Sequence, residues 1–198
     1  MPTNRNEHYE ESFKELDLSN QEVVRQQYEQ CIFVKCKFTE TQFRDCKFYD
    51  CEFKSCDLSL IKVGGCEFSN ILIEDSKAVG INWAELRLPM IRVYCPVEFI
   101  RCNINYSNFL GMDLREIQIV ECQAREVNFS ETNLSKSKLS DTDFTNSSFN
   151  KTNLSDADFT HAINYYIDVF HNQIKGAKFS FPEAITLLSS LDIEIVDE

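Results

Sequence analysis

Apolar residues recur at every fifth position along most of the chain. One series runs from Phe13 to Val93, and after a shift of one residue a second runs from Phe99 to Phe159. All thirty positions in the two series are apolar, although hydrophobic residues make up only 43% of the chain. Positions two residues before each centre hold no charged residue from Cys31 onward. Alternate residues of a β-strand share a face, so the pattern predicts short extended segments separated by corners.

A strict period of five over this length predicts a solenoid, in which each coil stacks on the previous one. An α-helix would need apolar spacings of three and four, which most of the chain lacks. Asn or Asp often precedes a centre, as at Asn133 and Asp158, and Ser or Thr often follows it, as at Ser135. Short polar side chains of this kind bond nearby backbone groups, so we expect them to support the corners without glycine.

The repeat is interrupted once in its interior. The shift of one residue falls within residues 94–98, beside Pro96. Proline cannot donate a hydrogen bond to a strand ladder, so we expect a β-bulge at this point. Either the bulge is only a kink or it re-aims side chains toward a partner.

The two ends of the chain depart from the repeat. We predict a tail over residues 1–12 and an irregular first coil over 13–30, where Glu11, Gln21 and Gln26 occupy the position otherwise held by small residues. The solenoid is predicted to end at residue 179.

Residues 180–198 are predicted to form a helix–strand cap. Ser180, Pro182 and Glu183 have the spacing of a capping box, which starts a helix that runs to about Ser190 with Ile185, Leu187 and Leu188 on its apolar side. The alternation from Leu191 to Ile195 predicts a strand. This cap covers the open end of the solenoid, forms a dimer interface, or does both.

The composition argues against catalysis and nucleic-acid binding. Eight of the nine Cys lie in the small-residue series, so we interpret them as packing residues rather than ligands or nucleophiles, and we expect neither a metal nor a cofactor. Acidic residues fit corners rather than a catalytic pair, so the protein is predicted not to be an enzyme. The net charge of -12 is unsuited to binding phosphates directly. Charge counts of -5, -3 and -4 for residues 1–98, 99–159 and 160–198 indicate diffuse negativity.

Location follows from two further features of the sequence. Reduced cysteines and the absence of an apolar signal-like segment in the first twelve residues predict a cytoplasmic protein. No apolar stretch approaches the length of a membrane span, so no membrane association is expected.

Segments such as Thr132–Lys136 and Ala157–His161 resemble the consensus of the pentapeptide-repeat family. The resemblance implies an all-β, right-handed quadrilateral β-helix with four repeats in each coil. Residues 174–179, together with the predicted helix and strand, are most similar to the branch that includes Qnr proteins and gyrase-poison immunity proteins. Members of that branch dimerise through their C-terminal caps and are thought to mimic DNA toward type II topoisomerases.

The resemblance therefore implies a DNA-mimicking partner of DNA gyrase or topoisomerase IV that confers protection from quinolones or toxins. The alternative is a scaffold or interaction rod with an unknown partner. Candidate partner-binding residues are Tyr94, Pro96, Glu98, Glu116, Glu121 and Asp141. Candidate dimerisation residues are Phe179, Phe181, Pro182, Ile185, Leu188, Leu191, Ile193 and Ile195.

Overall fold

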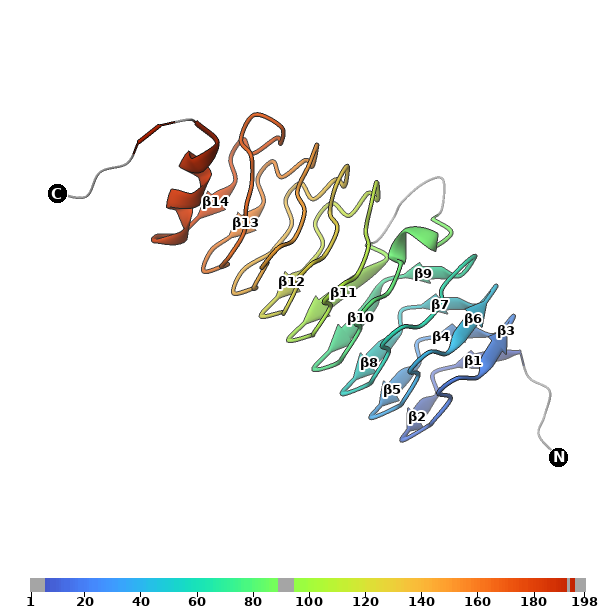
Figure 1. Cartoon of the computed structure of the whole chain (residues 1–198). Helices are drawn as coiled ribbons and strands as arrows, with labels where there is room; N and C mark the ends of the chain where they lie inside the picture. The colour runs from blue at the N-terminus through green and yellow to red at the C-terminus, as the bar shows by residue number, and fades with distance from the viewer. Residues whose placement is uncertain (1–5, 89–94, 192, 195–198) are drawn as a thin grey trace.

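The chain winds into a four-sided parallel β-helix of about eight coils (Figure 1). This computed structural model describes residues 6–88, 95–191 and 193–194. Segments 20 residues apart pair in parallel, so that Phe13 lies beside Phe33 and Phe33 beside Phe53. Four five-residue repeats therefore complete one coil, and the predicted right-handed quadrilateral β-helix is confirmed.

The regular elements are distributed over four faces. Face 1 carries β1 (Glu7–Tyr9), β4 (Gln27–Glu29), β7 (Lys47–Tyr49) and β9 (Glu67–Ser69). Face 2 carries β2 (Ser12–Lys14), β5 (Ile32–Val34), β8 (Glu52–Lys54), β10 (Ile71–Glu74), β11 (Val97–Ile100), β12 (Ile119–Val120), β13 (Asp158–Phe159) and β14 (Lys178–Phe179). Face 3 is paired only through single bridges, from Asp17 to Ile163.

Face 4 begins with β3 (Glu22–Val24) and β6 (Gln42–Arg44) and continues as single bridges to Ser148. A short 3-10 helix, η1 (Trp83–Glu85), lies on this face. A second 3-10 helix, η2 (Glu183–Leu191), follows the last coil and covers the C-terminal end of the rod (Figure 1).

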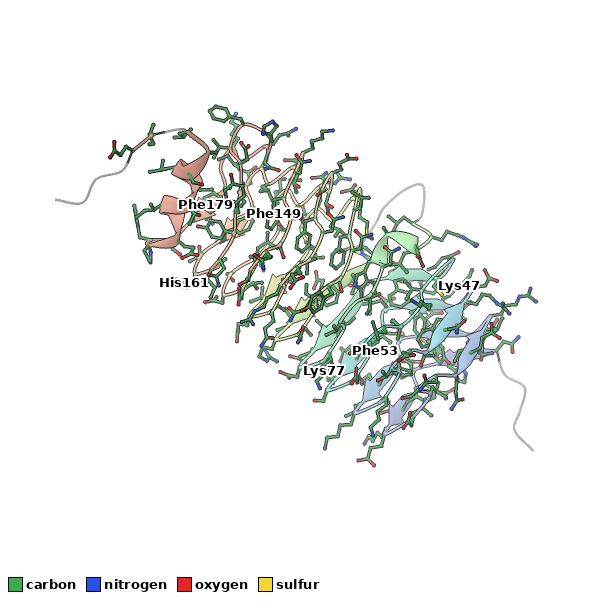
Figure 2. The ribbon with its side chains drawn as sticks, in the orientation of Figure 1. Lys47, Phe53, Lys77, Phe149, His161 and Phe179 are labelled. Carbon is green, nitrogen blue, oxygen red and sulfur yellow. The ribbon has the colours of Figure 1, made fainter. Side chains whose placement is uncertain are left out.

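Stacked aromatic rings fill the interior of the N-terminal coils. The ring of Phe33 lies 4.9 Å from that of Phe13 and 4.6 Å from that of Phe53, centroid to centroid, in parallel stacks. In Figure 2, Phe53 and Phe149 lie within the rod, whereas Lys47 and Lys77 lie on its outside. Burying one such ring stabilises the fold by about 1.5–3 kcal/mol, so the repeat of large apolar centres supplies most of the driving force.

The small-residue series links successive coils through hydrogen bonds. Thr132 Oγ1 donates to the carbonyl of Phe109 at 2.8 Å, and Cys36 Sγ contacts the carbonyl of Phe13 at 3.5 Å in the equivalent position. The backbone N–H of Cys56 in turn donates to Ser76 Oγ at 2.8 Å. Thiols thus occupy sites that hydroxyls fill elsewhere, in agreement with their interpretation as packing residues.

Corners are built from left-handed backbone and short polar side chains. Among the residues that the structure describes, twenty-six non-glycine residues have positive φ, nearly all of them two positions after an inward centre. Each costs about 1–2 kcal/mol against ordinary backbone. Asn and Asp before the centre offset part of this cost, as where the N–H of Ser130 donates to Asn128 Oδ1 at 3.0 Å. This is the corner chemistry predicted from the sequence.

The β-helix starts earlier than predicted. β1 pairs with β4, so residues 7–12 belong to the first coil rather than to a tail. Residues 13–30 also keep the regular 20-residue register, contrary to the predicted irregular coil. Glu11, Gln21 and Gln26, at inward positions of this coil, are polar and lie at the open end of the rod, where water replaces a neighbouring coil.

The interruption is larger than the predicted shift of one residue. The N–H of Arg87 donates to the carbonyl of Cys66 in the normal register, whereas Ile71 pairs with Val97, 26 residues later. One coil therefore holds six residues more than the others. Val93, predicted as an inward centre, lies outside the described residues, and Leu88, the last predicted centre before it, is 39% exposed.

The C-terminal cap differs from its prediction in two respects. Leu191, assigned to a strand, is the last residue of η2, and Ile193 and Glu194 lie outside any strand. The predicted capping box is also absent. Ser180 Oγ and Glu183 Oε1 instead accept hydrogen bonds from the backbone N–H groups of His161 and Asn164 in the last coil. Those N–H groups have no following coil to donate to, which explains why the cap side chains turn toward them.

Candidate protein-interaction surfaces

Charge is partitioned between the corners and the faces of the rod. Over residues 7–88 and 98–160, the positions immediately before and after each inward centre hold twelve Asp or Glu and eleven Lys or Arg. The left-handed corner positions in the same ranges hold twelve Asp or Glu but only five Lys or Arg. The faces are therefore nearly neutral, and the corners carry most of the negative charge. The negative charge is spread along the chain, as expected from the sequence, but around the rod it lies mainly at the corners.

The faces are neutral because opposite charges stack along them. On face 3 the bridges join Asp17 to Lys37, Lys37 to Asp57, and Asp57 to Lys77. Parallel in-register stacking brings side chains of neighbouring coils to about 4.8 Å, where like charges would repel. Alternation of sign relieves that repulsion, so the acids on the faces are largely compensated by their neighbours.

The corner acids have a different setting. Glu116, Glu121, Glu126 and Glu131 occupy all four corners of a single coil, with φ between 54° and 66°. Glycine, Asn and Asp suit left-handed backbone better than Glu does, so backbone geometry gives no reason for four glutamates. The result is a ring of outward carboxylates around the rod.

The predicted partner-binding residues fall into three settings. Glu116, Glu121 and Asp141 are exposed corner residues, and Asp141 lies 3.4 Å from the ring of His161 in the next coil. Glu98 lies within face 2, where Gln118 Nε2 donates to it at 3.0 Å. Pro96 is buried and so offers little surface, and Tyr94 lies outside the described residues.

Among the carboxyl groups with lowered pKa values, Asp75 and Asp143 show the effect of contacts between coils. Hydrogen bonds from Arg101 lower the pKa of Asp75, with Arg101 Nε at 2.7 Å from Asp75 Oδ1. Partial burial opposes ionisation of Asp143, but hydrogen bonds from Thr145, Asn164 and Arg125 lower its pKa to about 2. Both groups are held by structural contacts between coils.

The cap presents an apolar outer surface. Phe181 is 84% exposed and Ile193 55% exposed, and Ile185, Leu188 and Leu191 are each more than a third exposed. Leu187, on the other side of η2, packs against the core. Of the other predicted dimerisation residues, Pro182 is exposed, Phe179 stacks on Phe159 at 5.2 Å and Ile195 lies outside the described residues. Five of the eight residues are therefore exposed large apolar side chains, three of them spaced three residues apart on η2.

Sequence reasoning missed a set of exposed apolar residues along the rod. Tyr106 is 59% exposed, Leu110 46%, Tyr166 61% and Phe170 72%. Tyr106 stands at a corner, a position where the repeat itself gives no reason for an apolar residue. A check of corner positions for aromatic residues, at two residues after each centre, would have singled it out.

Two further features of the described residues bear on function. No three His, Cys, Asp or Glu side chains among them are grouped so that they could hold a metal ion. Within the same residues, no helix is long and apolar enough to span a membrane.

Comparison with known proteins identifies relatives of the fold. The profile of the pentapeptide repeat region matches residues 11–90 and 95–179. No curated protein sequence matches significantly. Two trypsin-treated forms of QnrB1, a plasmid-mediated fluoroquinolone resistance protein, are similar in structure, with 22% and 20% identity and TM-scores of 0.66 and 0.63. They cover 93% and 97% of this chain, and the matches span 100% and 91% of theirs.

HetL, a pentapeptide repeat protein from the cyanobacterium Nostoc sp. strain PCC 7120, is also similar. It is 15% identical, with a TM-score of 0.61, and the match covers 88% of this chain and 87% of HetL. HetL is described as involved in the regulation of heterocyst differentiation. At these identities the likeness establishes the fold.

Proposed function

We propose that this chain, which belongs to the pentapeptide repeat family, is a non-catalytic DNA mimic that binds a type II topoisomerase, DNA gyrase or topoisomerase IV. In this proposal, binding modulates the enzyme or protects it from quinolones or toxins. The concentration of carboxylates on the corners is the observation that carries the proposal. Twelve corner positions hold a carboxylate and five hold Lys or Arg, so the corners carry an excess of negative charge along the length of the rod.

The magnitude of the charge suits this role. A net charge of -12 over about eight coils spaced by about 4.8 Å is roughly one charge per 3 Å, about half the linear charge density of duplex DNA. A basic DNA-binding saddle would attract such a rod over long range and at a high association rate. The similarity to QnrB1, a fluoroquinolone resistance protein, is in keeping with the proposal.

The apolar outer surface of the cap supports a further part of the proposal, a homodimer. Exposed large apolar side chains gathered on one element favour association, because contact removes them from water. Pairing of two caps would join two rods end to end through Ile185, Leu188 and their neighbours. Such a dimer would offer the topoisomerase two anionic rods related by twofold symmetry.

Gyrase supercoiling assays test this function. Purified protein should inhibit supercoiling, or restore it in the presence of a quinolone. Replacement of two corner acids, Glu116→Gln with Glu121→Gln, should weaken the effect several-fold. The matched control, Glu52→Gln with Glu98→Gln, removes the same charge from face 2 and should weaken it less. Unchanged supercoiling at high micromolar protein, with and without a quinolone, would contradict the proposal and favour a scaffold with another partner.

A further inference from the structure

Face 4 has no charged residue at its outward positions between residues 80 and 150. Between residues 80 and 150 its outward positions are all Ala, Leu, Asn or Ser, namely Asn82, Ala84, Asn108, Leu110, Asn128, Ser130, Ser148 and Asn150. In the same coils each of the other three faces carries Lys, Arg, Asp or Glu, such as Arg115 on face 1, Lys138 on face 2 and Arg125 on face 3. In a chain of which 26% is charged, one face thus lacks formal charge.

Several exposed apolar residues lie on this same face or at its corners. In one coil Tyr106 stands at the corner before the face and Leu110 lies on the face, and the outward column continues at Tyr166 because Phe149 pairs with Ile167. Leu60, 42% exposed, occupies the same corner row as Tyr106 two coils earlier.

Gly80 lies between Leu60 and Tyr106 in that corner row. A Cβ on Gly80 would fall 2.6 Å from Leu60 Cδ2, so the leucine side chain lies across the glycine. The corner is therefore an apolar ridge along one side of the neutral face.

Most of the charge beside face 4 is acidic. Glu126 stands at the corner that precedes the face, and Glu85, in η1, and Glu131 follow it. Lys151, also on the following side, lies 3.9 Å from Glu131. Protein interfaces have the same layout, with a core that is depleted of charge and enriched in Tyr and Phe and a rim that is polar. The complementary surface is apolar and uncharged at its centre, with Lys or Arg around it.

We propose that face 4 from Gly80 to Asn150, with Tyr106, Leu110 and Tyr166, is the side of the rod that docks onto its protein partner. This inference rests on the proposed function and specifies which side of the rod faces the topoisomerase. The partner contacts face 4 with an apolar patch and the neighbouring corner carboxylates with a basic rim. The charge on the corners attracts the partner at long range. Contact with face 4 then fixes the rotation of the rod about its long axis.

A charge added to face 4 separates this inference from simple attraction between opposite charges. Ser148→Glu places a carboxylate in the outward column between Asn128 and Tyr166. Gln173→Glu, the matched control, adds the same charge at the equivalent outward position of face 1. If only net charge mattered, both variants would bind a basic saddle at least as well as the wild type. Docking through face 4 requires Ser148→Glu to bind more weakly because a buried, unpaired carboxylate is costly.

The experiment measures the Kd of full-length protein for DNA gyrase holoenzyme. We expect Ser148→Glu and the double variant Tyr106→Ser/Leu110→Ser each to raise Kd at least tenfold, and Gln173→Glu and Tyr9→Ser, an exposed tyrosine on face 1, to change it less than twofold. Thermal unfolding of each variant checks that the fold is retained.

Two outcomes would overturn the inference, and they are distinguishable. Wild-type affinity of both face 4 variants would refute docking through face 4 and leave gyrase binding intact. Failure of the wild type and of Gln173→Glu to bind gyrase would refute the proposed function and, with it, the inference.

Discussion

The two ends of the rod differ in how the exposed end coil is covered. At the N-terminal end some inward positions are polar, and Gln26 Nε2 donates to Asn6 Oδ1 at 3.4 Å. His8 closes the aromatic column there by stacking on Tyr28 at 4.8 Å. At the C-terminal end a helix covers the last coil, and its outer side is apolar. The first end is thus suited to water, whereas the second is suited to a partner.

The difference shows that a cap can cover the edge of the last coil without exposing an apolar surface. Ser180, Glu183 and Thr186 bond the backbone of the last coil, which satisfies the open edge without any second molecule. The exposed leucines and isoleucines of η2 are not needed for that purpose. Their presence therefore favours a protein interface at this end. Substitutions at each end of the rod test this interpretation.

Removal of the cap should have the largest effect. A chain that ends after Phe179 loses the side-chain bonds to the last coil and the packing of Leu187, which together contribute about 4 kcal/mol. We expect a thermal midpoint lower by more than 10 °C and a tendency to aggregate through the open edge. A chain that ends after Leu191 keeps η2 and should unfold like the wild type. Equal midpoints for both truncations would show that the cap does not protect the end.

Polar substitution on the outer side of η2 should dissociate the proposed dimer without loss of stability. Ile185→Ser with Leu188→Ser should weaken dimerisation at least a hundredfold, about 3 kcal/mol, because two exposed apolar side chains per protomer leave the interface. Light scattering would measure the change. Leu187→Ser, on the inner side of the same helix, should instead destabilise the fold. A monomeric wild type would disprove the dimer.

Acid should loosen the C-terminal end. Asp143 accepts a bond from Asn164 in the last coil, and its pKa is lowered to about 2 from an unfolded value of about 3.9. The stability it provides is fully present above the unfolded pKa and is lost as pH falls from about 4 to 2. The loss amounts to about 2 kcal/mol. Denaturant titrations should show this loss of stability at low pH in the wild type and a smaller loss in Asp143→Asn. The matched Asp57→Asn variant should lose as much stability as the wild type.

Loss of one bond between the cap and the last coil should cost less. Ser180→Ala leaves the N–H of His161 without its acceptor, which costs about 1 kcal/mol. Ser189→Ala, whose hydroxyl bonds only Thr186 within η2, should change stability by less than half of that. Urea unfolding would compare the two. An equal effect would indicate that the hydroxyl of Ser180 does not hold the cap.

The smallest effect on stability is expected at the N-terminal end. Gln26→Leu should change the free energy of unfolding by about 0.5 kcal/mol or less, since the residue is only partly buried. It should nevertheless promote association of N-terminal ends at high concentration, because an inward apolar residue is exposed there. Analytical ultracentrifugation of this variant and of Gln27→Leu, which points outward from face 1, would compare the two. Similar association of both would show that the polar end has no special role.

Much of the fold could be read from the sequence because each coil is local. An inward residue at every fifth position determines the strand, the corner and the next strand within a few residues, so the thirty apolar centres were sufficient to predict a solenoid. Corner chemistry at Asn128 and Asp158 followed from the same repeat. The outer side of the cap was also predictable, since Ile185 and Leu188 lie one turn apart.

What the sequence could not provide depends on contacts between coils. Only pairing of Ile71 with Val97 revealed a coil of 26 residues, because an apolar Val93 fits the repeat whether or not it lies in the core. The separation of neutral faces from anionic corners likewise required knowing which residues project from left-handed backbone and which stack on a neighbour of opposite charge. The period of five determined by itself that this chain is a rod with a capped end. The tertiary structure decided how its charge and its apolar residues are distributed around that rod, because distribution depends on register between coils and not on order along the chain.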